Sequence, residues 1–187
     1  YTKAEFQMKL DSILDDISKG KIFIHPTDTI YGLGCDATNS DAVKKVRDIK
    51  ERNTLPFSVI APNKTWIREN CVVDEKVIEW LKKLPGPYTL ILKLKNKNAI
   101  AKEVNNNMDT VGVRIINHWF HEAAKELNRP IISTSANRIG SDFMTSIDNL
   151  DISIKSKINF IIYEGEKSGK PSTIVNLTKD TESIEER

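Results

Sequence analysis

The sequence predicts an α/β domain in which a twisted, mixed and largely buried sheet of about seven strands is flanked by roughly four or five helices. Short apolar runs of strand type recur along the whole chain, and segments with helical spacing separate them. The length of 187 residues falls in the usual range of one domain, so we expect residues 1–187 to form a single domain.

The amino-terminal third begins with a predicted helix that Gly20 ends, followed by a strand over residues 21–25 that stops at Pro26. The helix is indicated by the spacing of Phe6, Leu10, Ile13, Leu14 and Ile17. A second helix is expected over residues 40–51, with Ser40 as its N-cap. It buries Val43, Val46 and Ile49.

The rest of the chain continues to alternate predicted strands with predicted helices. Residues 57–61 form a predicted strand, and a helix over residues 74–84 ends at the Pro-Gly-Pro of residues 85–87. Asn117 is expected to cap a helix that reaches residue 127. Further strands are predicted over residues 88–94, 111–116, 131–134, 160–163 and 173–177.

Composition excludes several classes of protein. The 28 Lys plus Arg and 26 Asp plus Glu give a net charge of +2, which argues against a constitutive, sequence-independent nucleic-acid binder. The apolar runs fall far short of the ~20 residues of a membrane span, so no membrane partner and a cytoplasmic location are expected. Cys35 and Cys71 are far apart and form no zinc pattern with the three histidines, which predicts buried thiols in a reducing compartment.

Three predicted strands end in polar segments, where ligands of α/β sheets tend to bind. The segments are HPTDTIYGLG at residues 25–34, IISTSAN at 131–137 and KPST at 170–173. In extended geometry Ser133, Ser135 and Asn137 share one face, which suits a carboxylate, a ribose or a phosphate. Taken singly, each segment also fits an ordinary turn, a polar edge or a helix cap.

Three cations complete the candidate site. Lys50 and Arg52 close the second predicted helix, where unravelling would let both reach one ligand, although a helix C-terminus favours cations in any case. Arg114 lies on the face of its strand opposite Val111 and Val113. A buried Arg on a central strand requires a carboxylate or phosphate partner, so Arg114 is a stronger functional candidate than Lys50 or Arg52.

These segments together resemble the YrdC-type threonylcarbamoyl-AMP synthase family. The matching pieces occur in the family's order over nearly the whole chain: PTDTIYGLG at 26–34, KER at 50–52, LPGPYTL at 84–90, VGVR at 111–114, STSAN at 133–137 and STIV at 172–175. The resemblance implies a fold like those of YrdC and DHBP synthase, with a large, positively lined concave cavity. It also implies that ATP, bicarbonate and L-threonine are converted into threonylcarbamoyl-AMP and pyrophosphate. Downstream tRNA threonylcarbamoyl-transferase proteins would use the product, and direct tRNA binding would be weak.

The resemblance also assigns residues. It implies an L-threonine site formed by Thr29, Tyr31, Arg114, Ser133 and Ser172. It implies an ATP site formed by Lys50, Arg52, Thr110, Ser135, Asn137 and Arg187. No base-activated nucleophile is evident, so we expect catalysis by positioning and by neutralisation of phosphate charge at Lys50 and Arg52. Mg²⁺ is the expected cofactor, held mainly by the ATP phosphates, and no protein metal site is predicted.

The chain departs from the family pattern at Leu55, Ile60 and Phe143, which stand where some relatives carry polar contacts. It ends at Arg187, so the extra C-terminal domain of the two-domain relatives lies outside it. Two other functions remain open. One is a non-catalytic RNA-binding module, and the other is a carbamoyl-adenylate domain of a larger maturation protein.

Overall fold

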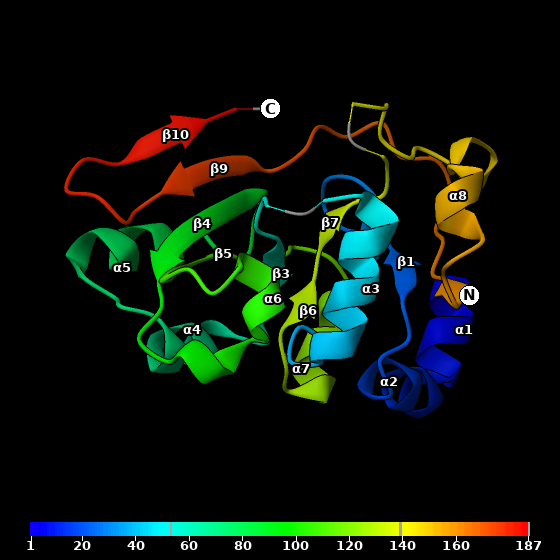
Figure 1. Ribbon diagram of the computed structural model, residues 1–187, viewed down its shortest axis with the longest axis horizontal. Coiled ribbons are helices and arrows are strands. Elements are labelled where there is room, and N and C mark those ends of the chain that lie inside the picture. The colour runs from blue at the N-terminus through cyan, green and yellow to red at the C-terminus, as the bar shows by residue number, and fades with distance from the viewer. Residues whose placement is uncertain (53, 139, 187) are drawn as a thin grey trace.

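The computed structural model describes residues 1–52, 54–138 and 140–186, which form a mixed α/β fold (Figure 1). The predicted class is confirmed, but the strands form two mixed sheets in place of one. The four-stranded sheet has the order β7 (Thr134–Ser135), β2 (Gly32–Gly34), β1 (Phe23–His25), β8 (Phe160–Ile161). The six-stranded sheet has the order β10 (Ser183–Glu185), β9 (Thr173–Asn176), β4 (Tyr88–Lys93), β5 (Thr110–Arg114), β3 (Ser58–Ile60), β6 (Ile131–Ile132).

The helices are short and surround the sheets. They are α1 (Lys3–Met8), α2 (Leu10–Ser18), α3 (Ser40–Lys50), α4 (Lys64–Asn70), α5 (Glu75–Lys82), α6 (Lys102–Asn105), α7 (His121–Leu127) and α8 (Ile152–Lys155), with 3-10 turns η1 (Lys97–Ala99) and η2 (Ile147–Asn149). Figure 1 shows α4 and α5 near β4 and places α1 and α2 near β1, at opposite ends of the molecule. Within the described ranges, no helix reaches the length and apolarity that a membrane span requires.

Several helix boundaries differ from the prediction. The single amino-terminal helix is in fact two, because the backbone leaves helical geometry at Lys9, with φ −114° and ψ 19°. The N-cap of α3 is Asn39, one residue before the predicted Ser40. Helix α4 was not predicted, and α7 begins at His121, later than Asn117 suggested. The backbone N–H of Asn117 is instead used in the pocket described below.

The seven predicted strands are all present, and β2, β7 and β10 are additional. The segment predicted as one strand over residues 131–134 is divided between the sheets. Ile132 pairs with Val59 in the six-stranded sheet, whereas Thr134 pairs with Leu33 in the four-stranded sheet. The chain therefore passes from one sheet to the other at Ser133, which places this residue at their junction.

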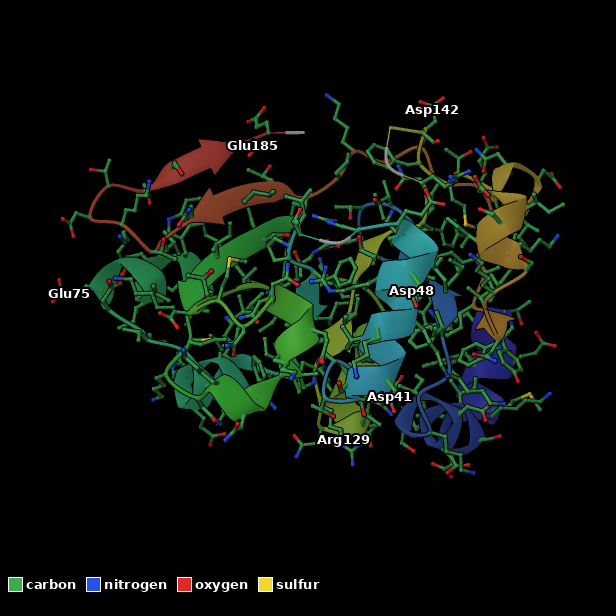
Figure 2. The ribbon with its side chains drawn as sticks, in the orientation of Figure 1. Asp41, Asp48, Glu75, Arg129, Asp142 and Glu185 are labelled. Atoms are coloured by element: carbon green, nitrogen blue, oxygen red, sulfur yellow. The ribbon has the colours of Figure 1, made fainter. Side chains whose placement is uncertain are left out.

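Two apolar clusters hold the fold together. The larger joins both sheets to α3 and α5 through residues such as Leu33, Val46 and Leu81, and it includes the buried thiols of Cys35 and Cys71. The smaller packs α1, α2 and α7 on Phe23 and Ile131. Charged side chains such as Glu75, Arg129 and Glu185 lie at the periphery of the molecule (Figure 2).

The glycines of β2 make room for a buried imidazole. The His25 ring is fully buried and stacks on Phe120, with 4.5 Å between ring centroids. Burial lowers the pKa of His25 to about 3, so the ring is neutral at physiological pH. A Cβ at Gly32 would lie 2.8 Å from the His25 ring and 3.0 Å from the Ser133 hydroxyl. Only glycine fits at this position, which explains a strand with poor intrinsic β-propensity.

We expect Gly32→Ala to lower the free energy of unfolding by about 1–3 kcal/mol, because the new methyl group overpacks the His25 ring. Adding His25→Ala removes that contact, so the double variant should be more stable than the sum of the two single losses predicts. Urea unfolding of the four proteins of this cycle measures the coupling. Strictly additive losses would contradict the packing argument.

Candidate functional site

A pocket of about 200 Å³ is lined by strands of both sheets. Most of the sequence-predicted site residues meet there, although the chain brings them from five separate segments. Eight of them line it: Thr29, Tyr31, Arg52, Thr110, Arg114, Ser133, Ser135 and Ser172. Lys50 and Asn137 are not among its lining residues, and Arg187 lies outside the described residues. The predicted binding role of each residue stays a prediction.

Arg114, which lines the pocket, forms a buried ion pair with Asp28. An Arg114 Nη2 donates to Asp28 Oδ1 at 2.8 Å and to the Thr29 hydroxyl at 3.1 Å. The other carboxylate oxygen accepts from the backbone N–H of Asn117 at 3.0 Å. The side chains of Arg114 and Asp28 are only 6% and 10% exposed. Arg114 lies on the central strand β5, so the carboxylate partner that its burial requires is present.

Asp28 was not predicted as a site residue. It follows β1 of the four-stranded sheet, whereas Arg114 belongs to the six-stranded sheet. The pair therefore joins the two sheets beside the pocket. The chemical need of Arg114 for a carboxylate indicated that a partner exists, but the sequence offered many carboxylates and no spacing that selects Asp28.

Neutral hydroxyl groups line another part of the wall, beside apolar side chains such as Phe57 and Ile91. The hydroxyls of Thr89 and Ser172 lie 2.7 Å apart, and both side chains are nearly buried. Gly112 lies beside them on β5, where a Cβ would come within 2.9 Å of the Ser58 hydroxyl. Ser58 and Thr89 were not predicted, because a lone hydroxyl inside an apolar strand gives little signal. Together these groups offer donors and acceptors suited to an ammonium, a hydroxyl or a carboxylate.

Lys50 ties the end of α3 to the segment that follows β7. Its ammonium donates to the carbonyl of Ser135 at 2.7 Å, to the carbonyl of Asn137, and to Asn137 Oδ1 at 3.1 Å. Burial, with the nearby Arg52 charge, lowers the pKa of Lys50 to about 8. Ser133 and Ser135 both line the pocket, but the extended strand β7 ends at Ser135. Asn137 therefore does not share their face and contacts Lys50 instead.

Arg52 reaches the pocket because α3 ends just before it. Glu51 adopts left-handed geometry, with φ 51°, and this reverses the direction of the chain after Lys50. Arg52 lines the pocket, whereas the Lys50 ammonium contacts the carbonyl oxygens of Ser135 and Asn137, and binding of one ligand by both cations stays a prediction. The Arg52 guanidinium lies over the Phe57 ring, with 5.4 Å to its centroid.

Arg47 holds the backbone around Arg52. Its guanidinium donates to the carbonyls of Arg52 at 2.8 Å and Glu103 at 2.6 Å, and also to those of Leu55 and Val104. Arg47 stands among other charged residues of α3, yet it is only 8% exposed. Its partners around residue 103 are distant in the sequence, so no local pattern identifies them.

The described residues include no group of three or more His, Cys, Asp or Glu side chains arranged to hold a metal ion. The Asp28 carboxylate beside the pocket is already bound to Arg114 and Asn117. This donor set fits Mg²⁺ only as an ion carried by the oxygens of a bound triphosphate.

Comparison with known proteins identifies relatives. The Sua5/YciO/YrdC family model, described as "Telomere recombination", matches residues 15–186. A Methanocaldococcus jannaschii protein, provisionally named a threonylcarbamoyl-AMP synthase, is 36% identical over 179 residues, which cover 91% of this chain and 81% of that protein. The threonylcarbamoyl-AMP synthase of Vibrio parahaemolyticus is 27% identical over 175 residues, covering 88% and 91% of the two chains.

The fold is also similar to a solved structure. The crystal structure of P. abyssi Sua5 complexed with L-threonine superposes with a TM-score of 0.84 at 30% identity. The match covers 95% of this chain and 53% of the Sua5 chain, so this chain spans about half the length of that protein.

We expect Asp28→Asn to lower the free energy of unfolding by roughly 3–5 kcal/mol, because it removes the carboxylate that faces a buried guanidinium. Glu51→Gln is the matched control, since Glu51 pairs with Arg138 while their side chains are 65% and 46% exposed. That change should cost under about 1 kcal/mol. Equal losses in thermal or urea unfolding would show that the Arg114 pair is not a structural requirement.

Proposed function

This chain belongs to the Sua5/YciO/YrdC family, and on that premise we propose that it is a threonylcarbamoyl-AMP synthase. The reaction joins L-threonine, bicarbonate and ATP into threonylcarbamoyl-AMP, with release of pyrophosphate and water. The observation that carries the proposal is the pocket itself, in which Arg114 and Arg52 stand among neutral hydroxyl groups. It supports binding of an amino-acid carboxylate and of the phosphates of a nucleotide at one place.

We propose that L-threonine lies against Arg114. A guanidinium on the pocket wall can bind the amino-acid carboxylate through charge-assisted hydrogen bonds. The hydroxyls of Thr29, Ser133 and Ser172 are suited to its ammonium and side-chain hydroxyl, and Tyr31 would border the same subsite. Because Asp28 already holds one edge of Arg114, the guanidinium is oriented before the substrate arrives.

ATP would occupy the side of the pocket formed by Arg52, Thr110 and Ser135. Arg52 is a permanent cation, and it would neutralise charge that develops on the phosphates during transfer. Lys50 and Asn137 would support this side by shaping the segment after β7, and direct contact of Lys50 with a phosphate is part of the proposal. Mg²⁺ would enter with ATP, held by its phosphate oxygens, and would neutralise part of their charge.

The chemistry requires a neutral threonine amine. The amine nitrogen forms a bond to the carbon of CO₂ derived from bicarbonate and releases a proton, which gives a carbamate. A carbamate oxygen then attacks the α-phosphorus of ATP, and the bond from that phosphorus to the bridging oxygen breaks as pyrophosphate leaves. The protein contributes by holding both substrates in line and by charge stabilisation, without a covalent intermediate.

The wider role follows from the product. Threonylcarbamoyl-AMP is a mixed anhydride, so a downstream transferase must pass its threonylcarbamoyl group to tRNA. We propose that such proteins are the functional partners, that direct tRNA binding is weak at a net charge of +2, and that the enzyme works in the cytoplasm, where its substrates occur.

The proposal is tested by incubating the purified chain with ATP, Mg²⁺, bicarbonate and labelled L-threonine. We expect pyrophosphate release that depends on threonine and bicarbonate, together with labelled threonylcarbamoyl-AMP. L-Serine and L-valine serve as substrate controls, because each lacks one group of threonine. Absence of threonine-dependent product, together with tight RNA binding that weakens steeply with salt, would favour the RNA-binding alternative.

The two arginines should have separable effects. Arg114→Lys keeps a positive charge opposite Asp28 but loses the planar fork, so we expect KM for threonine to rise about 10- to 100-fold with little change in KM for ATP. Arg52→Gln should show the reverse pattern or a loss of kcat. Steady-state kinetics with each substrate varied in turn make the comparison. Equal effects of both variants on both substrates would contradict the assignment.

A further inference from the structure

A strap of chain, residues 164–172, lies between β8 and β9 and ends at the pocket. Pro171 and Ser172 at its end line the pocket, and Ser172 contacts Thr89. The strap also touches another pocket residue, because a Cβ at Gly169 would lie only 2.1 Å from the carbonyl oxygen of Thr29. The strap backbone therefore packs directly on the loop that follows β1 and contains Thr29.

The strap begins at Glu164, whose carboxylate accepts from three different side chains. His118 Nε2 lies 2.9 and 3.0 Å from its two oxygens, Trp119 Nε1 donates at 2.6 Å, and Lys167 Nζ lies at 2.5 Å. His118 and Trp119 precede α7, so these contacts attach the start of the strap to a segment that is more than 40 residues away along the chain.

Protonation states agree with this geometry. The Phe120 N–H donates to His118 Nδ1, so a neutral His118 carries its proton on Nε2 and donates it to Glu164. Burial lowers the pKa of His118, which favours the neutral ring. Burial opposes ionisation of Glu164, but hydrogen bonds from Lys167, Trp119 and His118 outweigh it and lower the pKa of Glu164. Glu164 therefore remains an anionic acceptor at neutral pH.

The backbone at Glu164 also holds a pocket residue. Its N–H donates to the Tyr31 hydroxyl at 3.1 Å, and that hydroxyl donates to the carbonyl of Gly165 at 2.6 Å. Tyr31 lines the pocket and is fully buried. A displacement of Glu164 would thus loosen both the strap that carries Ser172 and the Tyr31 ring.

We propose that Glu164 is a positioning residue of the synthase, which anchors the strap so that Ser172 and Tyr31 keep the geometry needed for L-threonine. It acts through these residues and does not touch the substrate. The inference rests on the proposed function, because it assigns the strap to the threonine side of the pocket. Loss of the anchor should impair threonine use far more than ATP use.

The test compares Glu164→Ala and Glu164→Gln with Glu166→Gln. Glu166 lies in the same strap, is exposed, and among the described residues makes no hydrogen bond or ion pair, so it is the matched control. We expect KM for threonine to rise about tenfold in Glu164→Ala, with KM for ATP within about twofold. Glu164→Gln keeps one acceptor oxygen and should fall between the wild type and the alanine variant.

Amide hydrogen exchange gives a readout that is independent of activity. In Glu164→Ala, exchange should accelerate in peptides that cover residues 164–172, while peptides from α3 and β5 stay unchanged. If the strap of Glu164→Ala exchanges at the same rate as in the wild type, or if KM for threonine is unchanged, the proposal is overturned. Equal changes in both KM values with faster exchange throughout the protein would also overturn it. If the wild type forms no product, the proposed function fails, whereas the exchange experiment still tests the anchor.

Discussion

The structure depends on the burial of one guanidinium between two sheets. Arg114 lies on a central strand of the six-stranded sheet, and Asp28 reaches it from the loop after the first strand of the four-stranded sheet. A buried charge needs a partner of opposite sign, so the burial of Arg114 between the sheets requires a carboxylate such as that of Asp28. The same contact orients the guanidinium of Arg114, which lines the pocket.

Other buried cations of α3 shape the backbone around the pocket. Lys50 donates to carbonyl oxygens at and after the end of β7, and Arg47 donates to the carbonyl oxygens of Arg52, Leu55, Glu103 and Val104. Neither side chain lines the pocket, yet each holds a segment that does. Charge inside this protein therefore has two uses. Arg114 and Arg52 face the pocket, whereas Lys50 and Arg47 satisfy irregular backbone that would otherwise be buried without hydrogen bonds.

Much of this was predictable from the sequence, for identifiable reasons. The apolar runs located the strands, and the polar residues that follow them identified Thr29, Ser133 and Ser172 as candidate site residues. The division into two sheets was not predictable, because alternation along a strand does not say which strand it pairs with. Strand β2 was missed because it needs glycine next to the His25 ring, and glycine does not indicate a strand. Asp28, Arg47 and Glu164 were missed because their partners are remote in sequence.

We expect L-threonine to bind beside the Arg114–Asp28 pair, close to Ser172 at the end of the strap. A crystal structure of the chain with L-threonine and a non-hydrolysable ATP analogue tests it most directly. In that structure we expect the amino-acid carboxylate on Arg114 and the phosphates near Arg52. The ammonium and hydroxyl of threonine should lie near Thr29, Ser133 and Ser172. Threonine bound away from Arg114, or a nucleotide that occupies the Arg114 side, would contradict it.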